Sequence, residues 1–268
     1  MPKKSTIQSA KVNDHIVNWL KDYAVNANVK GFVVGISGGV DSAVTSTLCA
    51  QTGMTTLCVE LPIHQAESQV TRAREHITQL QQRFANVSCV EVILSNVFET
   101  FRGALPEEAE SAKPNLSLAN ARARLRMTTL YYFAGMHTLL VAGTGNKVED
   151  FGVGFFTKYG DGGVDISPIA NLLKSDVFAL AKYLQIPASI LSAAPTDGLF
   201  GDGRTDEDQL GASYDELEWA MDFAAQNSKT DLLSEREKEV LAIFKRQNKA
   251  NQHKMNPIPV CTIPDNIK

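Results

Sequence analysis

The chain has 268 residues, and its 26 basic and 30 acidic side chains give a formal net charge of -4 at pH 7. Hydrophobic residues make up 44% and charged residues 21%, a composition typical of a globular protein with a substantial core. No apolar run approaches the roughly 18 residues that span a membrane, the first residues lack the apolar segment of a secretory signal, and the mild acidity argues against non-specific nucleic-acid binding. We therefore expect a cytoplasmic protein that binds neither membranes nor nucleic acid.

Short apolar segments alternate with amphipathic patterns along the first half of the chain. Helical periodicity predicts helices over residues 6–27, 40–50, 66–84 and 116–135. Apolar runs predict strands over residues 31–36, 56–61, 89–94 and 138–142, the third of them followed by another helical pattern. This alternation is typical of right-handed βαβ units. It predicts a doubly wound α/β fold, a parallel sheet flanked by helices.

The second half of the chain is less regular. We expect helices over residues 213–227 and 234–249, the first capped by Ser213 with Glu216 three residues on. Residues 196–211 carry four glycines and five acidic residues and are expected to form a mobile loop, and residues 256–268, with three prolines, an extended tail. With no internal repeat and no domain boundary, residues 1–268 are predicted to form a single domain.

The cysteines exclude some chemistry. Cys49, Cys58, Cys89 and Cys261 are scattered and form no C-x-x-C pair. A structural zinc site or a redox dithiol is therefore not expected. Free buried thiols in a reducing compartment are the natural interpretation.

A glycine-rich loop, GISGGVDS over residues 35–42, lies between the first predicted strand and the next helix. In an open α/β sheet, ligands bind at the carboxyl ends of the strands. Glycines let backbone N–H groups face an anion, and the following helix adds its positive end. A plain connecting turn would not need so many donors at one strand end, so we interpret the loop as a phosphate cradle.

The cradle is neither a Walker loop nor a G-x-G-x-x-G fingerprint, because Val40 and Asp41 stand where a Walker loop requires Gly and Lys. A carboxylate beside bound phosphates would repel them unless a cation lay between. Asp41 therefore predicts Mg²⁺ as a cofactor. The S-G-G-x-D-S pattern resembles the loop of the N-type ATP pyrophosphatases, which split ATP between its α and β phosphates.

Three further segments narrow this resemblance. They read NARARLRM over residues 120–127, GTGNKVE over residues 143–149 and GFFTKYGDGGVD over residues 154–165. Together they resemble the ammonia-dependent NAD⁺ synthetase family, whose fold is adenine-nucleotide alpha hydrolase-like. The match continues in chain order through Pro168, Leu173, Lys174, Pro195, Thr196, Asp206, Glu207, Leu210, Gly211, Tyr214, Asp215, His253 and Lys254.

The resemblance implies a reaction and a set of residues for it. ATP adenylylates the nicotinate carboxylate of deamido-NAD⁺, pyrophosphate leaves, and ammonia attacks the mixed anhydride to give NAD⁺ and AMP. Asp41 and Lys174 are then the expected catalytic residues, and Asp41 and Glu149 the expected Mg²⁺ ligands. The expected contacts to ATP, the co-substrate, are Gly35, Ile36, Ser37, Gly38, Gly39, Val40, Asp41, Ser42, Thr144, Lys174 and Thr196.

The arginines of residues 120–127 cannot all contact one ligand. At about 100° per residue, Arg122 and Arg126 share a helix face, and Arg124 points to the opposite one. The resemblance implies that Arg124 contacts deamido-NAD⁺, which leaves Arg122 and Arg126 as structural or dimer-contact residues. The other implied dinucleotide contacts, in a homodimeric family, are Lys158, Asp165, His253 and Lys254.

One segment departs from the family pattern. The family commonly reads Pro-Thr-Ala-Asp-Leu, whereas this chain has PTDGL over residues 195–199, which moves the acid to Asp197. The residues that follow, 200–208, resemble the family's flexible lid. We expect them to close over the adenylate and exclude water.

The extent of the synthetase pattern bears on which nitrogen donor the chain uses. The synthetase pattern fills the chain and leaves no segment for a glutaminase domain, so free ammonia is expected unless a separate subunit supplies it. Two alternatives stay open: another ATP pyrophosphatase, GMP synthetase-like or tRNA-thiolating, and a non-catalytic ATP-binding module. Thiolation would call for paired cysteines and a basic surface, and a module would not need Asp41, Glu149 and Lys174 together.

Overall fold

A parallel sheet of four strands organises the molecule. The computed structural model describes residues 7–106, 113–196, 205–226 and 232–268. The strands are β1 (Gly31–Gly35), β2 (Thr55–Glu60), β3 (Val87–Glu91) and β4 (Leu139–Val141), in the order β3-β2-β1-β4. Phe32, Val33 and Val34 in β1 are fully buried. A strand so apolar on both faces requires helices on both sides of the sheet.

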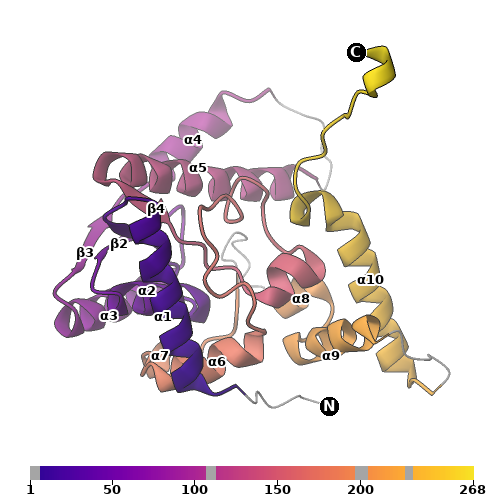
Figure 1. The fold of residues 1–268 in the computed structure, drawn as a ribbon, viewed down its shortest axis with the longest axis horizontal. Helices are drawn as coiled ribbons and strands as arrows, with labels where there is room; N and C mark the ends of the chain where they lie inside the picture. The colour runs from indigo at the N-terminus through magenta and orange to yellow at the C-terminus, as the bar shows by residue number, and fades with distance from the viewer. Residues whose placement is uncertain (1–6, 107–112, 197–204, 227–231) are drawn as a thin grey trace.

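Helices cover both faces (Figure 1). One face carries α1 (Ser9–Asn26), α2 (Val40–Gln51), α3 (Glu67–Arg83), α6 (Lys174–Tyr183) and α7 (Ala188–Leu191), which share a core with Phe32 and Val34. The other face carries α4 (Ser95–Gly103) and α5 (Lys113–His137), packed on Val33. The predicted doubly wound α/β fold is confirmed.

A third group of elements packs around a core of its own. It comprises the π-helix η1 (Val148–Val153), α8 (Asp206–Leu210), α9 (Tyr214–Ala225) and α10 (Glu235–Met255). Its buried residues include Val148, Leu217 and Phe244. Beyond α10 the chain runs extended and exposed to the short 3₁₀ helix η2 (Asp265–Ile267), as expected for the tail (Figure 1).

Several expectations need correction. The strand predicted at residues 89–94 lies at Val87–Glu91, and the helix predicted to end at residue 249 continues to Met255. Residues 206–210, expected in a mobile loop, form α8, because Thr205 and Asp208 make a capping box. Two of the four free thiols expected to be buried, Cys89 and Cys261, are exposed.

Three further elements that the sequence pattern missed, α6, α7 and η1, are short, with four to ten residues each. So few residues give too few repeats for a helical period to stand out. In the part of the chain that the structure describes, no helix combines the length and the apolar character needed to cross a bilayer.

Candidate active site

The strands β1, β2 and β4 end at one cleft of about 290 Å³. β1 pairs with β2 on one side and with β4 on the other, so the strand order reverses between β1 and β4. Such a switch point is where open α/β sheets bind ligands. The cleft is lined by all eight residues of the predicted phosphate cradle: Gly35, Ile36, Ser37, Gly38, Gly39, Val40, Asp41 and Ser42.

Hydrogen bonds between two serines and the backbone hold the cradle in shape. Ser37 Oγ accepts from Gly39 N at 3.2 Å, Ser42 Oγ donates to Gly39 O at 3.0 Å, and the two hydroxyl oxygens lie 3.1 Å apart. Gly38 has φ +81°, and a Cβ there would lie 2.4 Å from Gln69 O. Position 38 therefore requires glycine, both because φ is positive there and because the backbone of α3 approaches closely.

Lys174 forms the charged centre of the cleft. Its ammonium donates to Asp41 Oδ2 at 2.7 Å and to Glu149 Oε1 at 3.0 Å. The side chain of Lys174 is 4% exposed, and those of Asp41 and Glu149 are 17% and 15% exposed. The three predicted residues come from the starts of α2, η1 and α6, so the fold brings together a set that is scattered in sequence.

Lys174 is the first residue of α6, and the packing of this helix fixes its position. Glu218 of α9 is buried and accepts from both Ser175 N, at 2.8 Å, and Ser175 Oγ, at 2.7 Å. A carboxylate at a helix N-terminus is favourable because the helix dipole is positive there. Glu218 therefore ties the start of α6 to the third group of elements, and with it the ammonium of Lys174.

A second layer of polar residues orients the carboxylates. Asn146 donates to Asp41 Oδ1 at 3.1 Å and accepts from Glu149 N at 3.2 Å. The Tyr214 hydroxyl lies 2.6 Å from Glu149 Oε1 and 3.0 Å from Asp206 Oδ2. Asp206 opens α8, so this layer connects the charged centre to the element that follows residues 197–204.

Burial and charge shift the pKa values of this centre. Burial acts to lower the pKa of Lys174, but the charges of Asp41 and Glu149 outweigh it, so the pKa is raised. Burial, together with Glu149, raises the pKa of Asp41. Burial also opposes ionisation of Glu149, yet Lys174 and the Tyr214 hydroxyl hold its pKa below the ordinary value. The centre thus keeps Lys174 charged.

The oxygen atoms of Asp41 and Glu149 suit Mg²⁺, which takes one or two carboxylates and completes its shell with phosphates and water. Both carboxylates face one point, the position of the Lys174 ammonium. Among the described residues no group of three or more His, Cys, Asp or Glu forms a metal cluster. The donor set therefore fits a metal ion that arrives with a polyphosphate better than an all-protein metal site.

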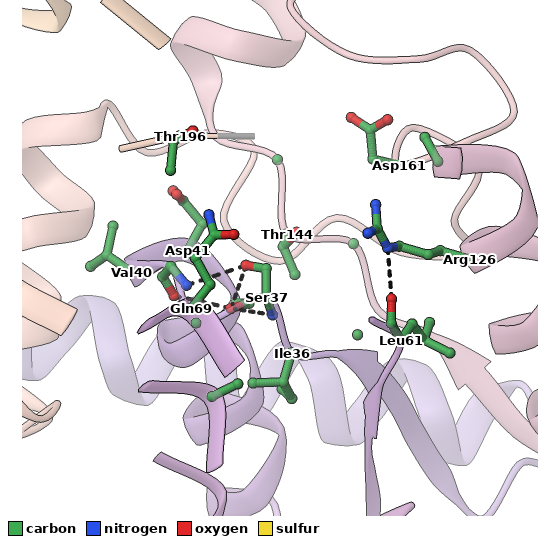
Figure 2. A pocket seen from close by; sticks show the side chains of 18 of the residues that line it. Ile36, Ser37, Val40, Asp41, Leu61, Gln69, Arg126, Thr144, Asp161 and Thr196 are labelled. Atoms are coloured by element: carbon green, nitrogen blue, oxygen red, sulfur yellow. Dashed lines mark hydrogen bonds between the residues drawn. The ribbon is translucent and has the colours of Figure 1, made fainter. Parts of the chain in front are cut away.

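The cleft contains further predicted and unpredicted residues (Figure 2). Thr144 and Thr196, both expected ATP contacts, line it. Arg126, expected to be structural or at a dimer contact, also lines it, and donates to Leu61 O at 3.0 Å and Gln65 Oε1 at 2.8 Å. Helix geometry separated Arg126 from Arg124, but it could not show which of the two faces the cleft.

Two acidic residues of the cleft had no assigned role. Asp150 follows Glu149 in η1, and burial together with the nearby Glu149, Asp161 and Asp41 raises its pKa to about 8. Asp161 lies on the same side of the cleft as Arg126 (Figure 2) and accepts from Thr157 N at 3.0 Å. A π-helix commonly marks a functional position, and here it turns two successive acids toward the cleft.

The expected dinucleotide contacts lie outside the main cleft. Arg124 donates to Lys158 O at 3.3 Å, and Lys158 Nζ donates to His253 O at 2.5 Å, so the exposed Arg124 and His253 are joined through the half-buried Lys158. His253, which follows the expected end of the helix at residue 249, lies in the last turn of α10. Lys254 donates to Phe156 O, and Asp165 accepts from Val141 N at 2.8 Å. Asp197 and residues 200–204 of the expected lid lie outside the described residues.

Comparisons with known proteins agree with this geometry. The family model described as NAD synthase matches residues 12–258. The chain belongs to the NAD synthase family. It is 38% identical over 242 residues to the NH3-dependent NAD⁺ synthetase of Carboxydothermus hydrogenoformans. The matched region covers 90% of this chain and 93% of that relative.

Two solved structures resemble this NAD synthase family member over nearly its whole length. The NMN synthetase from Francisella tularensis has a TM-score of 0.82 at 33% identity, with 97% of this chain and 99% of that chain covered. The NH3-dependent NAD synthetase from Campylobacter jejuni has a TM-score of 0.77 at 22% identity, with 96% and 100% covered, and shows the shared fold. Family membership favours a synthetase over the other pyrophosphatases and over a non-catalytic ATP module.

The residues that orient Asp41 and Glu149 in this NAD synthase site were not predicted from the sequence. Tyr214, Asp206 and Asn146 stand in the motifs that carried the resemblance, but no chemistry was assigned to them. A pattern could have pointed to Asn146, because it lies between two residues with assigned roles, Thr144 and Glu149. Tyr214 and Asp206 reach Glu149 only through the packing of α8 and α9, which no spacing reveals.

Proposed function

We propose that this chain amidates the nicotinate carboxylate of deamido-NAD⁺ with ammonia, at the expense of ATP, to give NAD⁺, AMP and pyrophosphate. The observation that carries the proposal is the buried Lys174–Asp41–Glu149 centre beside the glycine cradle at the switch point of the sheet. Polyphosphate and a developing negative charge need cations of this kind. The proposal includes a cytoplasmic location and a single synthetase domain over residues 1–268.

The cradle and the charged centre divide the work on ATP. Backbone N–H groups of the cradle and the N-terminus of α2 would bind the β and γ phosphates. Mg²⁺, held by Asp41 and Glu149, would neutralise charge on the departing pyrophosphate. Lys174, released from one of its two carboxylates, would donate to the same phosphates, with Thr144 and Thr196 as further contacts to ATP.

The reaction proceeds in two steps, adenylylation of the carboxylate and then its amidation. In the first, a nicotinate carboxylate oxygen attacks the α-phosphorus of ATP, a new P–O bond forms, and the bond to pyrophosphate breaks. In the second, ammonia attacks the carbonyl carbon, a C–N bond forms, the C–O bond to AMP breaks, and the extra proton on nitrogen passes to water. Closure against water matters here, because hydrolysis would destroy the adenylate.

The dinucleotide residues suggest that the site is shared between subunits of a homodimer. Arg124, Thr128, Tyr132 and Met136 recur every four residues on α5 and are all exposed; we refer to them as the α5 stripe. Tyr132 and Met136 are 61% and 63% exposed. A stripe that combines exposed aromatic and apolar side chains is typical of an interface. If a second copy packs there, Arg124 faces the partner's substrate rather than its own cleft.

A second substrate has a specific observation in its favour. The NMN synthetase from Francisella tularensis is 33% identical and has a TM-score of 0.82. Nicotinate mononucleotide carries the same carboxylate as deamido-NAD⁺ and lacks the adenylyl half. The cleft chemistry would be the same for both substrates, and only the group of Arg124, Lys158 and His253 would distinguish them.

An assay that omits one component at a time tests the function. Purified protein is incubated with ATP, Mg²⁺, ammonium and either deamido-NAD⁺ or nicotinate mononucleotide, and pyrophosphate and the amide product are measured. We expect both products only when all components are present, with the larger kcat/KM for deamido-NAD⁺. ATP binding without turnover would contradict the proposal. A larger kcat/KM for the mononucleotide would reassign the substrate.

A further inference from the structure

Three cationic side chains line the cleft in the described part of the chain: Arg72, Arg126 and Lys174. Lys174 lies between the carboxylates of Asp41 and Glu149. When both carboxylates are ionised, this centre carries one more negative than positive formal charge. Before Mg²⁺ is bound, it therefore offers no net attraction to a polyphosphate, and positive charge has to come from another side of the cradle.

Arg72 supplies such a charge from the side of β2. It lies in the second turn of α3, which follows β2, whereas Glu149 and Lys174 follow β4, and these two strands flank β1 in the sheet. The backbone of α3 lies against the cradle, since a Cβ at Gly38 would lie 2.4 Å from Gln69 O. Figure 2 shows Gln69 at this side of the cradle, and Arg72 follows three residues later on the same helix.

The protein uses only part of the Arg72 guanidinium. Its Nε atom donates to Gly38 O, in the middle of the cradle, at 3.2 Å. Among the described residues, Nη1 and Nη2 of Arg72 donate to no acceptor, and no carboxylate lies within ion-pair distance of them. The side chain is half-buried. A guanidinium held by one hydrogen bond therefore stands at the edge of a phosphate cradle with its remaining N–H groups free for a ligand.

We propose that Arg72 binds the pyrophosphate half of ATP, with Nη1 and Nη2 donating to oxygen atoms of the leaving group. This inference rests on the proposed function and adds a catalytic residue to its first step, because those oxygens gain negative charge as the bond to the α-phosphorus breaks. The planar fork of a guanidinium matches phosphate oxygens. The hydrogen bond from Nε to Gly38 O fixes the fork before ATP arrives.

Arg72→Gln tests this role with little disturbance of the cradle. The amide nitrogen of Gln lies as many bonds from Cα as the Nε of Arg, so the variant can keep the hydrogen bond to Gly38 O while it loses the charge and the other donors. Arg72→Lys restores the charge. Arg102→Gln, exposed on α4 and absent from the cleft lining, is the matched control.

Two kinds of measurement are made on each variant. Calorimetric titration in the presence of Mg²⁺ gives the dissociation constants of pyrophosphate and of AMP. Steady-state assays give the KM values for ATP and for deamido-NAD⁺. The titrations need no turnover, so they decide the role of Arg72 independently of the proposed reaction.

Arg72→Gln should raise the dissociation constant of pyrophosphate and the KM for ATP by about tenfold or more, the effect of losing a charge-assisted hydrogen bond. Its dissociation constant for AMP and its KM for deamido-NAD⁺ should stay within about twofold of wild type, because neither ligand carries the leaving pyrophosphate. Arg72→Lys should bind pyrophosphate about threefold or more tighter than Arg72→Gln, since it restores the charge without the fork. Arg102→Gln should match wild type in every measurement.

An unchanged affinity for pyrophosphate in Arg72→Gln overturns the inference, as does a wild type that does not bind pyrophosphate. Equal losses of affinity for pyrophosphate and AMP also overturn it, because they would assign Arg72 to the shape of the cradle alone. Should Arg72→Gln fail to fold, Arg72→Met is used for the same comparison. A wild type that binds pyrophosphate but forms no amide product would refute the proposed function instead.

Discussion

Lys174 holds two partly buried carboxylates at once and is itself almost fully buried. Replacement by Met keeps the length of the side chain but leaves Asp41 and Glu149 facing each other without a cation. We expect Lys174→Met to lower the free energy of unfolding by about 3 kcal/mol and kcat for pyrophosphate release by about 100-fold or more. Urea unfolding and the pyrophosphate assay measure the two effects. Lys182→Met, exposed on the same helix, should change neither, and an active Lys174→Met enzyme would contradict the assignment.

Gly38 and Gly39 offer a matched pair for the cradle. Gly38 has φ +81°, and a Cβ there would lie 2.4 Å from the backbone oxygen of Gln69, whereas a Cβ at Gly39 would meet only Ser37 Oγ, at 3.3 Å. Gly38→Ala should therefore lower the free energy of unfolding by about 2 kcal/mol or more, through strain and displacement of α3. Gly39→Ala should cost much less stability. Equal losses in denaturant unfolding would contradict the steric requirement for glycine at position 38.

Residues that act through the backbone or through a contiguous motif could be predicted from the sequence, and those that act across elements could not. The cradle was predicted because its glycines, hydroxyls and Asp41 are adjacent in the chain. Tyr214 was not assigned a role in the site, because its partner Glu149 lies 65 residues away in the sequence. The position of Arg126 in the cleft lining could not be predicted either, because helical spacing orders residues around an axis without saying which side faces the ligand.

At the scale of elements, α2 and α3 are joined by a buried histidine. His76 of α3 is 0% exposed and lies 2.9 Å from Ser46 Oγ of α2. Burial, with the nearby charge of Arg83, lowers the pKa of His76 from 6.5 to about 4. The unfolded chain therefore takes up a proton between these two pH values that the folded chain refuses, and the contribution of this group to stability falls as pH drops through that window.

This sign gives a measurable pH dependence. Between pH 7 and pH 5, we expect wild type to lose about 2 kcal/mol more of unfolding free energy than His76→Gln. Urea unfolding at the two pH values measures the difference, and comparison with the variant removes the contributions of other titrating groups. His15→Gln, exposed on α1, should follow wild type. Parallel pH profiles for wild type and His76→Gln would show that His76 is not buried in its neutral form.

The elements differ in how well the sequence predicted them. The helices α2 and α5 follow from periodicity and lie within three residues of their expected bounds. The short elements α6 and η1 were missed, yet they carry Lys174, Glu149 and Asp150. Their positions depend on tertiary contacts such as those between Ser175 and Glu218. Functional elements of this kind are specified by packing more than by local pattern.

At the scale of the whole molecule, the α5 stripe decides whether the site is complete in one chain. Its Tyr132 and Met136 are exposed, and Arg124 lies on the same face. Replacing Tyr132 and Met136 together by Glu would place charges in an apolar interface, which costs several kcal/mol when they are buried unpaired. We expect the wild type to sediment as a dimer and the double variant as a monomer. Because Arg124 would then lose its partner, the KM for deamido-NAD⁺ should rise while that for ATP stays within about twofold.

Two controls separate this prediction from a general loss of structure. Tyr183→Glu, exposed on α6, should sediment as a dimer and keep both KM values. Arg124→Ala should sediment as a dimer and still raise the KM for deamido-NAD⁺, because it removes the contact without disturbing the interface. A wild-type monomer with full activity would contradict the shared site. A dimer that persists in the double variant would place the interface on another face, and Arg124 would then have to act within its own chain, through the group that it forms with Lys158 and His253.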